Sequence, residues 1–279
     1  MSENTLSITD HSRDSAGLRY VYPVVSRRAG GVSIGINLNP NNACNWRCIY
    51  CQVPDLTRGT APPIDLVLLE KELSGFLHEL QHGYFMQRVP PEARRINDIA
   101  LSGNGEPTSA QEFAEVIKVI ARHKPADLKL VLITNGSLMQ RENVQQGLRC
   151  MAQLNGEVWF KLDRASAVAM AQVNDTKMTM DKVRHNLATA IECCPNTWLQ
   201  TCWFALDGSA PSKQDEDDYL DFLASLQGEG IKPQGVLLYG LARPSLQQEA
   251  TRISALSSEV MERFSQRISA LGLQVRLST

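Results

Sequence analysis

The chain has 279 residues, of which 43% are apolar, and its formal net charge is −2. This length suits a single α/β barrel domain, and the nearly balanced charge disfavours a protein that wraps nucleic acid through an overall basic surface. No apolar run approaches the roughly 18 residues that a membrane span needs. Residues 1–18 are polar and carry both charge signs, unlike a secretory signal or a transit peptide. We therefore expect a soluble, cytoplasmic protein without membrane contact, in which the seven cysteines stay reduced.

Short apolar runs alternate with amphipathic segments along the chain, and this pattern predicts strands and helices in turn. Before them, residues 20–28 and 32–36 flank the turn signal Ala29-Gly30-Gly31, which is typical of a hairpin or a bent extended lead-in. The predicted strands lie over residues 33–38, 98–101, 130–133, 158–162, 198–204 and 236–238. Apolar residues recur at helical spacing over residues 69–80, 113–120, 144–151, 183–191, 220–226 and 260–271.

Six alternations of strand and helix indicate an α/β fold with a parallel sheet buried on both faces. Six such units, rather than eight, favour a partial (β/α)6 TIM-like barrel that is open on one side. We expect residues 1–33 to form an N-terminal extended lead-in and residues 34–279 to form one barrel domain. The acidic run at residues 215–218 suits the N-terminus of a helix, where negative charge complements the helix dipole.

Three cysteines follow the first predicted strand with the spacing Cys-x3-Cys-x2-Cys: Cys44, Cys48 and Cys51. One short loop can point three thiolates at three corners of an iron-sulfur cube, whereas a four-iron cluster normally has four cysteine ligands. The fourth iron would then be open to an exogenous chelate. Tyr50, just before the last cysteine, offers a ring to a flat base beside that iron.

Two alternative roles for the cysteines stay open. The thiols could be buried small apolar side chains, as free cysteines often are, or three ligands of a structural zinc ion. Zinc needs a fourth ligand, and the nearest candidates, His11, His78, His82 and Cys150, are distant in the sequence. The spacing therefore favours the cluster.

Polar residues mark the ends of the next two predicted strands, where ligands collect in parallel α/β folds. The second strand runs into Gly103-Asn104-Gly105-Glu106. The glycines let the backbone approach a ligand closely, and Glu106 could accept an ammonium group. The third strand ends in Thr134-Asn135, groups suited to ribose hydroxyls or a carboxylate. Both segments could instead be ordinary glycine turns.

Lys161 and Asp163 share one face of the fourth predicted strand, because side chains alternate along a strand. A charged pair on a buried strand is costly unless it is paired or bound to a ligand. If this face is the barrel lumen, both are candidate catalytic residues; a mutual pair that fills the barrel is the alternative. Later in the chain, Cys202 could donate a hydrogen atom or be a buried inert thiol. Arg243 could bind a carboxylate or phosphate, or form a structural ion pair.

The cysteine loop and these later segments together resemble the signature of radical S-adenosylmethionine (SAM) enzymes. Within that superfamily the chain resembles the group that includes the tRNA wyosine synthases, but it lacks that group's N-terminal second-cluster cysteines, since no cysteine precedes Cys44. The resemblance implies a 4Fe-4S cluster on Cys44, Cys48 and Cys51. It also implies that SAM is cleaved reductively to a 5′-deoxyadenosyl radical, with an electron donor such as flavodoxin or ferredoxin. The residues expected to hold SAM are Tyr50, Gly103, Asn104, Gly105, Glu106, Thr134 and Asn135.

The substrate is less constrained than the chemistry. A tRNA nucleoside is the favoured candidate, because of the group resemblance and a modest arginine excess near the N-terminus, where Arg27, Arg28 and Arg58 are candidates for docking RNA. A glycyl-radical-type activase of a partner protein is a second option. A non-catalytic iron-sulfur protein for electron transfer or sensing is a third, which Glu106 and its flanking glycines disfavour.

Overall fold

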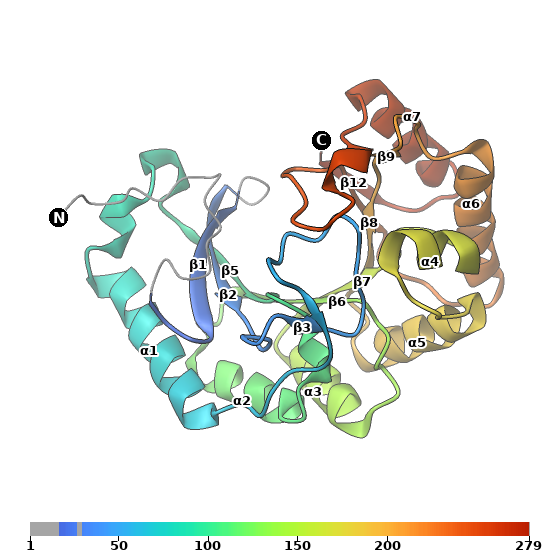
Figure 1. Ribbon diagram of the computed structural model, residues 1–279. Helices are drawn as coiled ribbons and strands as arrows, with labels where there is room; N and C mark the ends of the chain where they lie inside the picture. Colours follow the sequence, from blue (N-terminus) through green and yellow to red (C-terminus); the bar gives the residue numbers. More distant parts are fainter. Residues whose placement is uncertain (1–16, 27–29, 279) are drawn as a thin grey trace.

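An eight-stranded sheet forms the centre of the molecule, with strand order β1-β2-β5-β6-β7-β8-β10-β12 (Figure 1). The computed structural model describes residues 17–26 and 30–278. From β2 to β12 every neighbouring pair is parallel, whereas β1 pairs antiparallel with β2 at one edge. Within the described ranges no pairing joins β12 back to β1, so the barrel is open between these two strands.

The sheet strands are β1 (Val21–Ser26), β2 (Gly31–Ile36), β5 (Ile96–Leu101), β6 (Lys129–Thr134), β7 (Glu157–Lys161), β8 (Thr197–Cys202), β10 (Val236–Tyr239) and β12 (Val275–Ser278). Two short pairs lie outside this sheet. They are β3 (Ala43–Cys44) with β4 (Thr57–Arg58), and β9 (Ala205–Leu206) with β11 (Ile253–Ser254).

Helices cover the convex, outer side of the curved sheet (Figure 1). They are α1 (Leu66–His82), α2 (Phe113–His123), α3 (Glu142–Gln153), α5 (Met180–Cys193), α6 (Lys213–Gly228) and α7 (Ser258–Ser269). A further short helix, α4 (Ala167–Asn174), lies between β7 and α5 in the chain. Short 3-10 turns span Phe85–Arg88, Pro91–Ala93, Pro107–Ser109 and Ala250–Arg252. The chain passes from strand to helix six times between β2 and α7, so the predicted α/β class and partial (β/α)6 barrel are confirmed.

All six predicted strands and all six predicted helices are present. The predicted hairpin is present too, since β1 pairs with β2 along its whole length, although Ala29 of its turn lies outside the described residues. The short helix α4 and the last strand β12 were not predicted. Because β1 belongs to the barrel sheet, the lead-in packs with the barrel from Val21 onward.

Local signals in the sequence set several helix starts. The Asp65 side chain accepts from the backbone N of Leu68 and caps α1. Ser212 and Asp215 form a capping box at the start of α6, which places the acidic run at a helix N-terminus as expected. Trp203 stacks on Phe264 at 4.2 Å between ring centroids, so α7 is anchored directly beyond β8. Each helix among the described residues falls short of the length and hydropathy that a lipid-spanning helix requires.

Candidate active site at the carboxyl ends of the strands

Cys44 ends β3, and Cys48 and Cys51 lie on the loop that leads from β3 to β4; all three are free thiols that are partly exposed. The backbone N of Trp46 donates to Cys44 Sγ at 3.4 Å, and Asn174 Nδ2 donates to Cys48 Sγ at 3.2 Å. Burial raises the pKa of Cys44 to about 12 and also raises the pKa of Cys48. Metal coordination reverses this effect, because a coordinated thiol is deprotonated.

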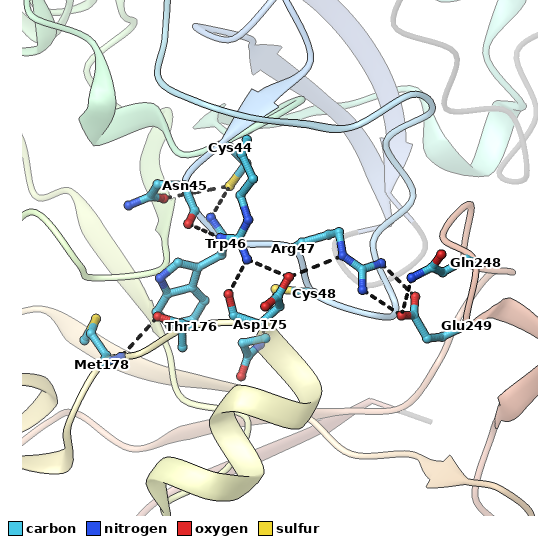
Figure 2. A network of polar contacts seen from close by, with 12 residues as sticks. Cys44, Asn45, Trp46, Arg47, Cys48, Asp175, Thr176, Met178, Gln248 and Glu249 are labelled. Carbon is cyan, nitrogen blue, oxygen red and sulfur yellow. Dashed lines mark hydrogen bonds and ion pairs between the residues drawn. The ribbon is translucent and has the colours of Figure 1, made fainter.

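The end of α4 holds the loop in place around Cys48 (Figure 2). The backbone N of Arg47 donates to the Asn174 carbonyl at 3.2 Å, and that of Ile49 donates to the Val173 carbonyl at 2.9 Å. Arg47 also forms ion pairs with Asp175 at 3.4 Å and Glu249 at 2.6 Å. The loop backbone is therefore fixed on both sides of one motif cysteine.

A second arginine binds the same helix end. Arg58 lies 2.7 Å from the Asp175 carboxylate and also donates to the backbone carbonyls of Asn45 and Asp175. Its charge is thus matched within the molecule, which bears on its expected role in docking RNA.

The cysteine loop fits an iron-sulfur cluster in its donor set. Within the described part of the chain, no three His, Cys, Asp or Glu side chains are grouped as ligands of one metal ion. A four-iron cluster needs no such group, because each thiolate binds a different iron. Three free thiols on one short, braced loop therefore suit separate corners of a cluster.

Gly103 and Gly105 allow the loop after β5 to pack tightly on the segment that leads into the cysteines. A Cβ atom at Gly105 would overlap the Ala43 carbonyl oxygen, and one at Gly103 would overlap the Asn37 side chain. Gly103 also has φ +150°, which side chains disfavour. The close approach that the glycines permit is thus to residues 37–43, and contact with SAM stays a prediction.

Asn104 lies between these glycines and joins the same contact. Its backbone N donates to Asn37 Oδ1 at 3.1 Å, and its Nδ2 donates to Asn42 Oδ1 at 2.6 Å. Its own Oδ1 is buried without a hydrogen-bond partner. An unpaired buried acceptor costs free energy, and a donor from a ligand would remove that cost.

Glu106 is 2% exposed and anchors two strand-end loops. Its Oε1 accepts from Thr108 N at 3.1 Å, Thr108 Oγ1 at 2.6 Å and Thr134 Oγ1 at 2.6 Å. Its Oε2 accepts from Asn135 N at 2.6 Å. Burial raises the pKa of Glu106 even though these bonds lower it. Oε2 accepts only one of these four bonds, so it has acceptor capacity for a further donor.

The segment after β6 is tied directly to the cysteine loop. Asn135 Nδ2 donates to Asn45 Oδ1 at 2.8 Å, Asn45 Nδ2 donates to Ser137 Oγ at 2.7 Å, and Ser137 Oγ donates to Asn135 Oδ1 at 2.6 Å. This ring of three side chains places the predicted SAM residues Thr134 and Asn135 beside the motif. Asn45 was not predicted as a site residue, because an asparagine within a cysteine loop carries no signal of its own.

Lys161 and Asp163 are joined through the Tyr50 hydroxyl, which hydrogen-bonds to both. Lys161 Nζ donates to the Tyr50 hydroxyl at 2.8 Å and to the Tyr239 hydroxyl at 3.3 Å, and the Tyr50 hydroxyl donates to Asp163 Oδ2 at 2.5 Å. Burial lowers the pKa of Lys161, but the neighbouring tyrosine and aspartate oxygens outweigh it and raise that pKa well above its ordinary value. These neighbours favour the ammonium form of Lys161.

The aromatic ring of Tyr50 packs edge-on against Phe204 at 5.4 Å between centroids, and Lys161 Nζ lies 5.1 Å from the Tyr50 centroid. Cys202 is buried, and its backbone N donates to Asp163 Oδ1 at 2.8 Å. Beside Lys161 on the neighbouring strand, Gln200 is 4% exposed and its Oε1 has no hydrogen-bond partner. Gln200 was not predicted as a site residue, although it lies on the same face of β8 as Cys202.

Curated proteins resemble the chain over part or most of its length. No protein-family model matches it. A UPF0026 protein of Helicobacter pylori is 32% identical over 130 residues, which are 46% of this chain and 38% of that protein. A UPF0026 protein of Synechocystis is 24% identical, covering 92% of this chain and 95% of that protein. The match to the first thus spans less than two fifths of its length.

Solved structures define the fold family. Coproporphyrinogen III oxidase of Escherichia coli, a radical SAM enzyme, covers 86% of this chain and matches over 52% of its own, with TM-score 0.53 and 12% identity. SuiB of Streptococcus suis bound to SAM covers 88% and matches over 50% of its chain, with TM-score 0.56 and 12% identity. TYW1 with a lysine-pyruvate adduct bound covers 87% and matches over 74%, with TM-score 0.56 and 16% identity. The chain therefore has the fold of radical SAM enzymes.

Proposed function

We propose that this chain is a radical SAM enzyme that binds a 4Fe-4S cluster on Cys44, Cys48 and Cys51. One observation carries the proposal: three free thiols on one braced loop lie beside the buried carboxylate of Glu106, at the carboxyl ends of a partial (β/α)6 barrel. A sensor or electron-transfer protein needs the thiols, but it needs no acceptor for an amino acid next to them. When bound, the cluster and SAM supply the one-electron reductive cleavage that yields methionine and a 5′-deoxyadenosyl radical.

Residues of two strand-end loops bind SAM in this proposal, each through a different group. Glu106 Oε2 has an acceptor position left for the methionyl ammonium. The Asn104 side-chain oxygen Oδ1 is buried without a partner and would accept from a hydroxyl or ammonium of the same ligand. Thr134 and Asn135 position Glu106 through two short hydrogen bonds, so their main contribution is to orient its carboxylate.

Lys161 contributes a fixed positive charge to the lumen. Its ammonium is held by Tyr50 and Tyr239 and would attract a carboxylate or phosphate group. Asp163 orients Tyr50, and through it Lys161, from a buried position. The structural neighbour TYW1 carries a lysine-pyruvate adduct. In this chain a lysine held as an ammonium favours a role in binding rather than in forming an imine.

A tRNA nucleoside is the proposed substrate, with flavodoxin or ferredoxin as the proposed electron donor. Support for RNA comes from the likeness in fold to TYW1 and from the N-terminal arginines. Arg58 is already paired with Asp175, so electrostatic docking would depend on Arg27 and Arg28, which lie outside the described residues. Phosphate contacts make RNA affinity fall with salt. Arg27→Gln with Arg28→Gln should therefore weaken tRNA binding and flatten its salt dependence, while Arg58→Gln should leave the salt slope unchanged.

The decisive experiment uses anaerobically reconstituted protein. It is incubated with SAM, a chemical reductant and separate RNA, protein or metabolite fractions, and 5′-deoxyadenosine is measured. Stimulation by the RNA fraction supports the proposal, and stimulation by the protein fraction would favour the activase instead. A protein that binds no cluster, or binds one without cleaving SAM, would overturn the proposed enzyme.

A further inference from the structure

Asn174, at the carboxyl end of α4, connects a motif cysteine to the lumen. The residue is 0% exposed. Its Nδ2 donates to Cys48 Sγ at 3.2 Å and to Asp163 Oδ2 at 2.7 Å. No sequence motif pointed to this residue, since Asn174 lies 126 positions from Cys48.

The partners of the amide fix the direction in which it points. An ionised carboxylate only accepts hydrogen bonds, so the nitrogen of Asn174 rather than its oxygen must face Asp163. Asp163 is itself held by the Tyr50 hydroxyl and the Cys202 backbone N. One N–H of Asn174 is thereby committed to Asp163, and the other is directed at Cys48 Sγ.

The backbone keeps this contact short. Asn174 and Val173 each offer a backbone carbonyl to the residues that flank Cys48, Arg47 and Ile49. The sulfur and the amide are consequently held on two segments that are hydrogen-bonded to each other. Any group bound to Cys48 would keep the amide as its neighbour.

We infer that Asn174 is a positioning residue whose amide donates to the Cys48 thiolate and raises the reduction potential of the cluster bound there. The inference rests on the proposed function, because it needs a cluster on Cys48. A reduced cluster carries one more negative charge than an oxidised one, and an N–H donor to a ligand sulfur stabilises the more negative form. Hydrogen bonds to the sulfurs are among the factors that set iron-sulfur potentials.

The hydrogen bond to Cys48 comes from a side chain, so the residue at position 174 decides whether it forms. Cys44 receives its hydrogen bond from the backbone N of Trp46, which side-chain substitution leaves in place. The contact to Cys48 depends on the residue at position 174. Cluster potential, rather than cluster attachment, is therefore the property that this asparagine sets.

The test is Asn174→Leu, which keeps the approximate side-chain size and removes both N–H donors. Parent and variant are reconstituted anaerobically, and the midpoint potential is measured by titration followed with electron paramagnetic resonance. We expect a more negative potential, with reduction disfavoured up to about tenfold, which is about 59 mV for a one-electron couple. Asn186→Leu is the matched control: Asn186 is equally buried, but its Nδ2 donates to the Gly136 carbonyl. It should lose stability and keep the parent potential.

An unchanged potential in Asn174→Leu with a full cluster would overturn the inference, and so would an equal shift in both variants. If Asn174→Leu retains no cluster, the contact between Asn174 and the cluster is tested in the parent protein instead. Protein labelled with nitrogen-15 in the asparagine side-chain amides should show a nitrogen coupling to the reduced cluster by pulsed resonance, and its absence refutes the contact. A parent without a cluster would overturn both proposals, whereas SAM cleavage with an unaltered potential would overturn only this one.

Discussion

Arg47 and Glu249 lie 202 residues apart in the sequence, and their side chains form a two-point ion pair. Arg47 Nη2 lies 2.6 Å from Glu249 Oε1, and Nη1 lies 2.9 Å from Oε2 (Figure 2). Parallel hydrogen bonds of this kind are stronger and more directional than a single ionic contact. The middle of the cysteine loop is thus fastened to the C-terminal part of the chain.

This pair predicts a pH dependence of stability. Arg47 lowers the pKa of Glu249 to about 2, below the usual value of about 4.3. Because the folded-state pKa is the lower one, the stabilisation is fully present above about pH 5 and is lost as pH falls toward 2. In urea titrations, the difference in unfolding free energy between the parent and Glu249→Gln should be constant from pH 6 to about pH 5 and should shrink from there to pH 3. A difference that stays constant over this range would contradict the assignment.

Iron binding should depend on the three motif cysteines alone. Replacing Cys44, Cys48 and Cys51 together by Ala should remove about four irons per chain, because each thiolate holds a separate iron. The matched control replaces Cys150, Cys193 and Cys194, on or just after α3 and α5, and should keep the iron. Iron and sulfide assays decide the matter. A full cluster in the first variant, or stoichiometric zinc in oxygen-free parent protein, would refute the cluster assignment.

Glu106 should affect both SAM affinity and stability. Glu106→Ala deprives Thr108, Thr134 and Asn135 of their acceptor, and unpaired buried donors cost about 1–3 kcal/mol. Loss of a charge-assisted bond to the ammonium should also weaken SAM binding about tenfold or more. Glu106→Gln separates the two effects, since it keeps one oxygen acceptor but not the charge. Calorimetry that finds parent-like SAM affinity in both variants would assign Glu106 a structural role only.

Lys161 should act through its charge. Its ammonium is held by two tyrosine hydroxyls, so treatment with pyruvate and a borohydride should give no mass increase on Lys161. Lys161→Arg should retain more SAM cleavage than Lys161→Met, because arginine keeps the positive charge. A trapped adduct by mass spectrometry, or equal inactivity of the two variants, would indicate that the amine itself reacts.

The sequence predicted the helices and strands in which apolar residues recur at a clear period. It also predicted the cysteine motif, whose members lie close together in the chain. The three cysteines fall within eight residues, so their spacing alone was informative. Helix α4 escaped prediction because its eight residues begin Ala-Val-Ala-Met, apolar without helical periodicity. Strand β12 alternates over only four residues.

The partners of the site residues could not be predicted in the same way. Glu106 is bonded to Thr134, 28 positions later, and Tyr50 to Asp163, 113 positions later. Nothing local in the sequence specifies such pairs, which exist only because parallel strands bring their carboxyl ends to one edge of the sheet. The roles of Asn45 and Asn174 have the same origin.

The bond from Arg47 to Glu249 has a consequence for biosynthesis. A ribosome that adds 5–20 residues per second needs about 10–40 s to make the 202 residues that separate them. During that interval Arg47 has been made while Glu249 has not. A carrier that delivered a cluster to the nascent chain would bind a cysteine loop without the Arg47–Glu249 ion pair. A carrier that acted after release of the chain would bind a loop in which this ion pair has formed. The 202-residue separation therefore gives the loop two successive states during synthesis, unpaired before Glu249 is made and paired after it.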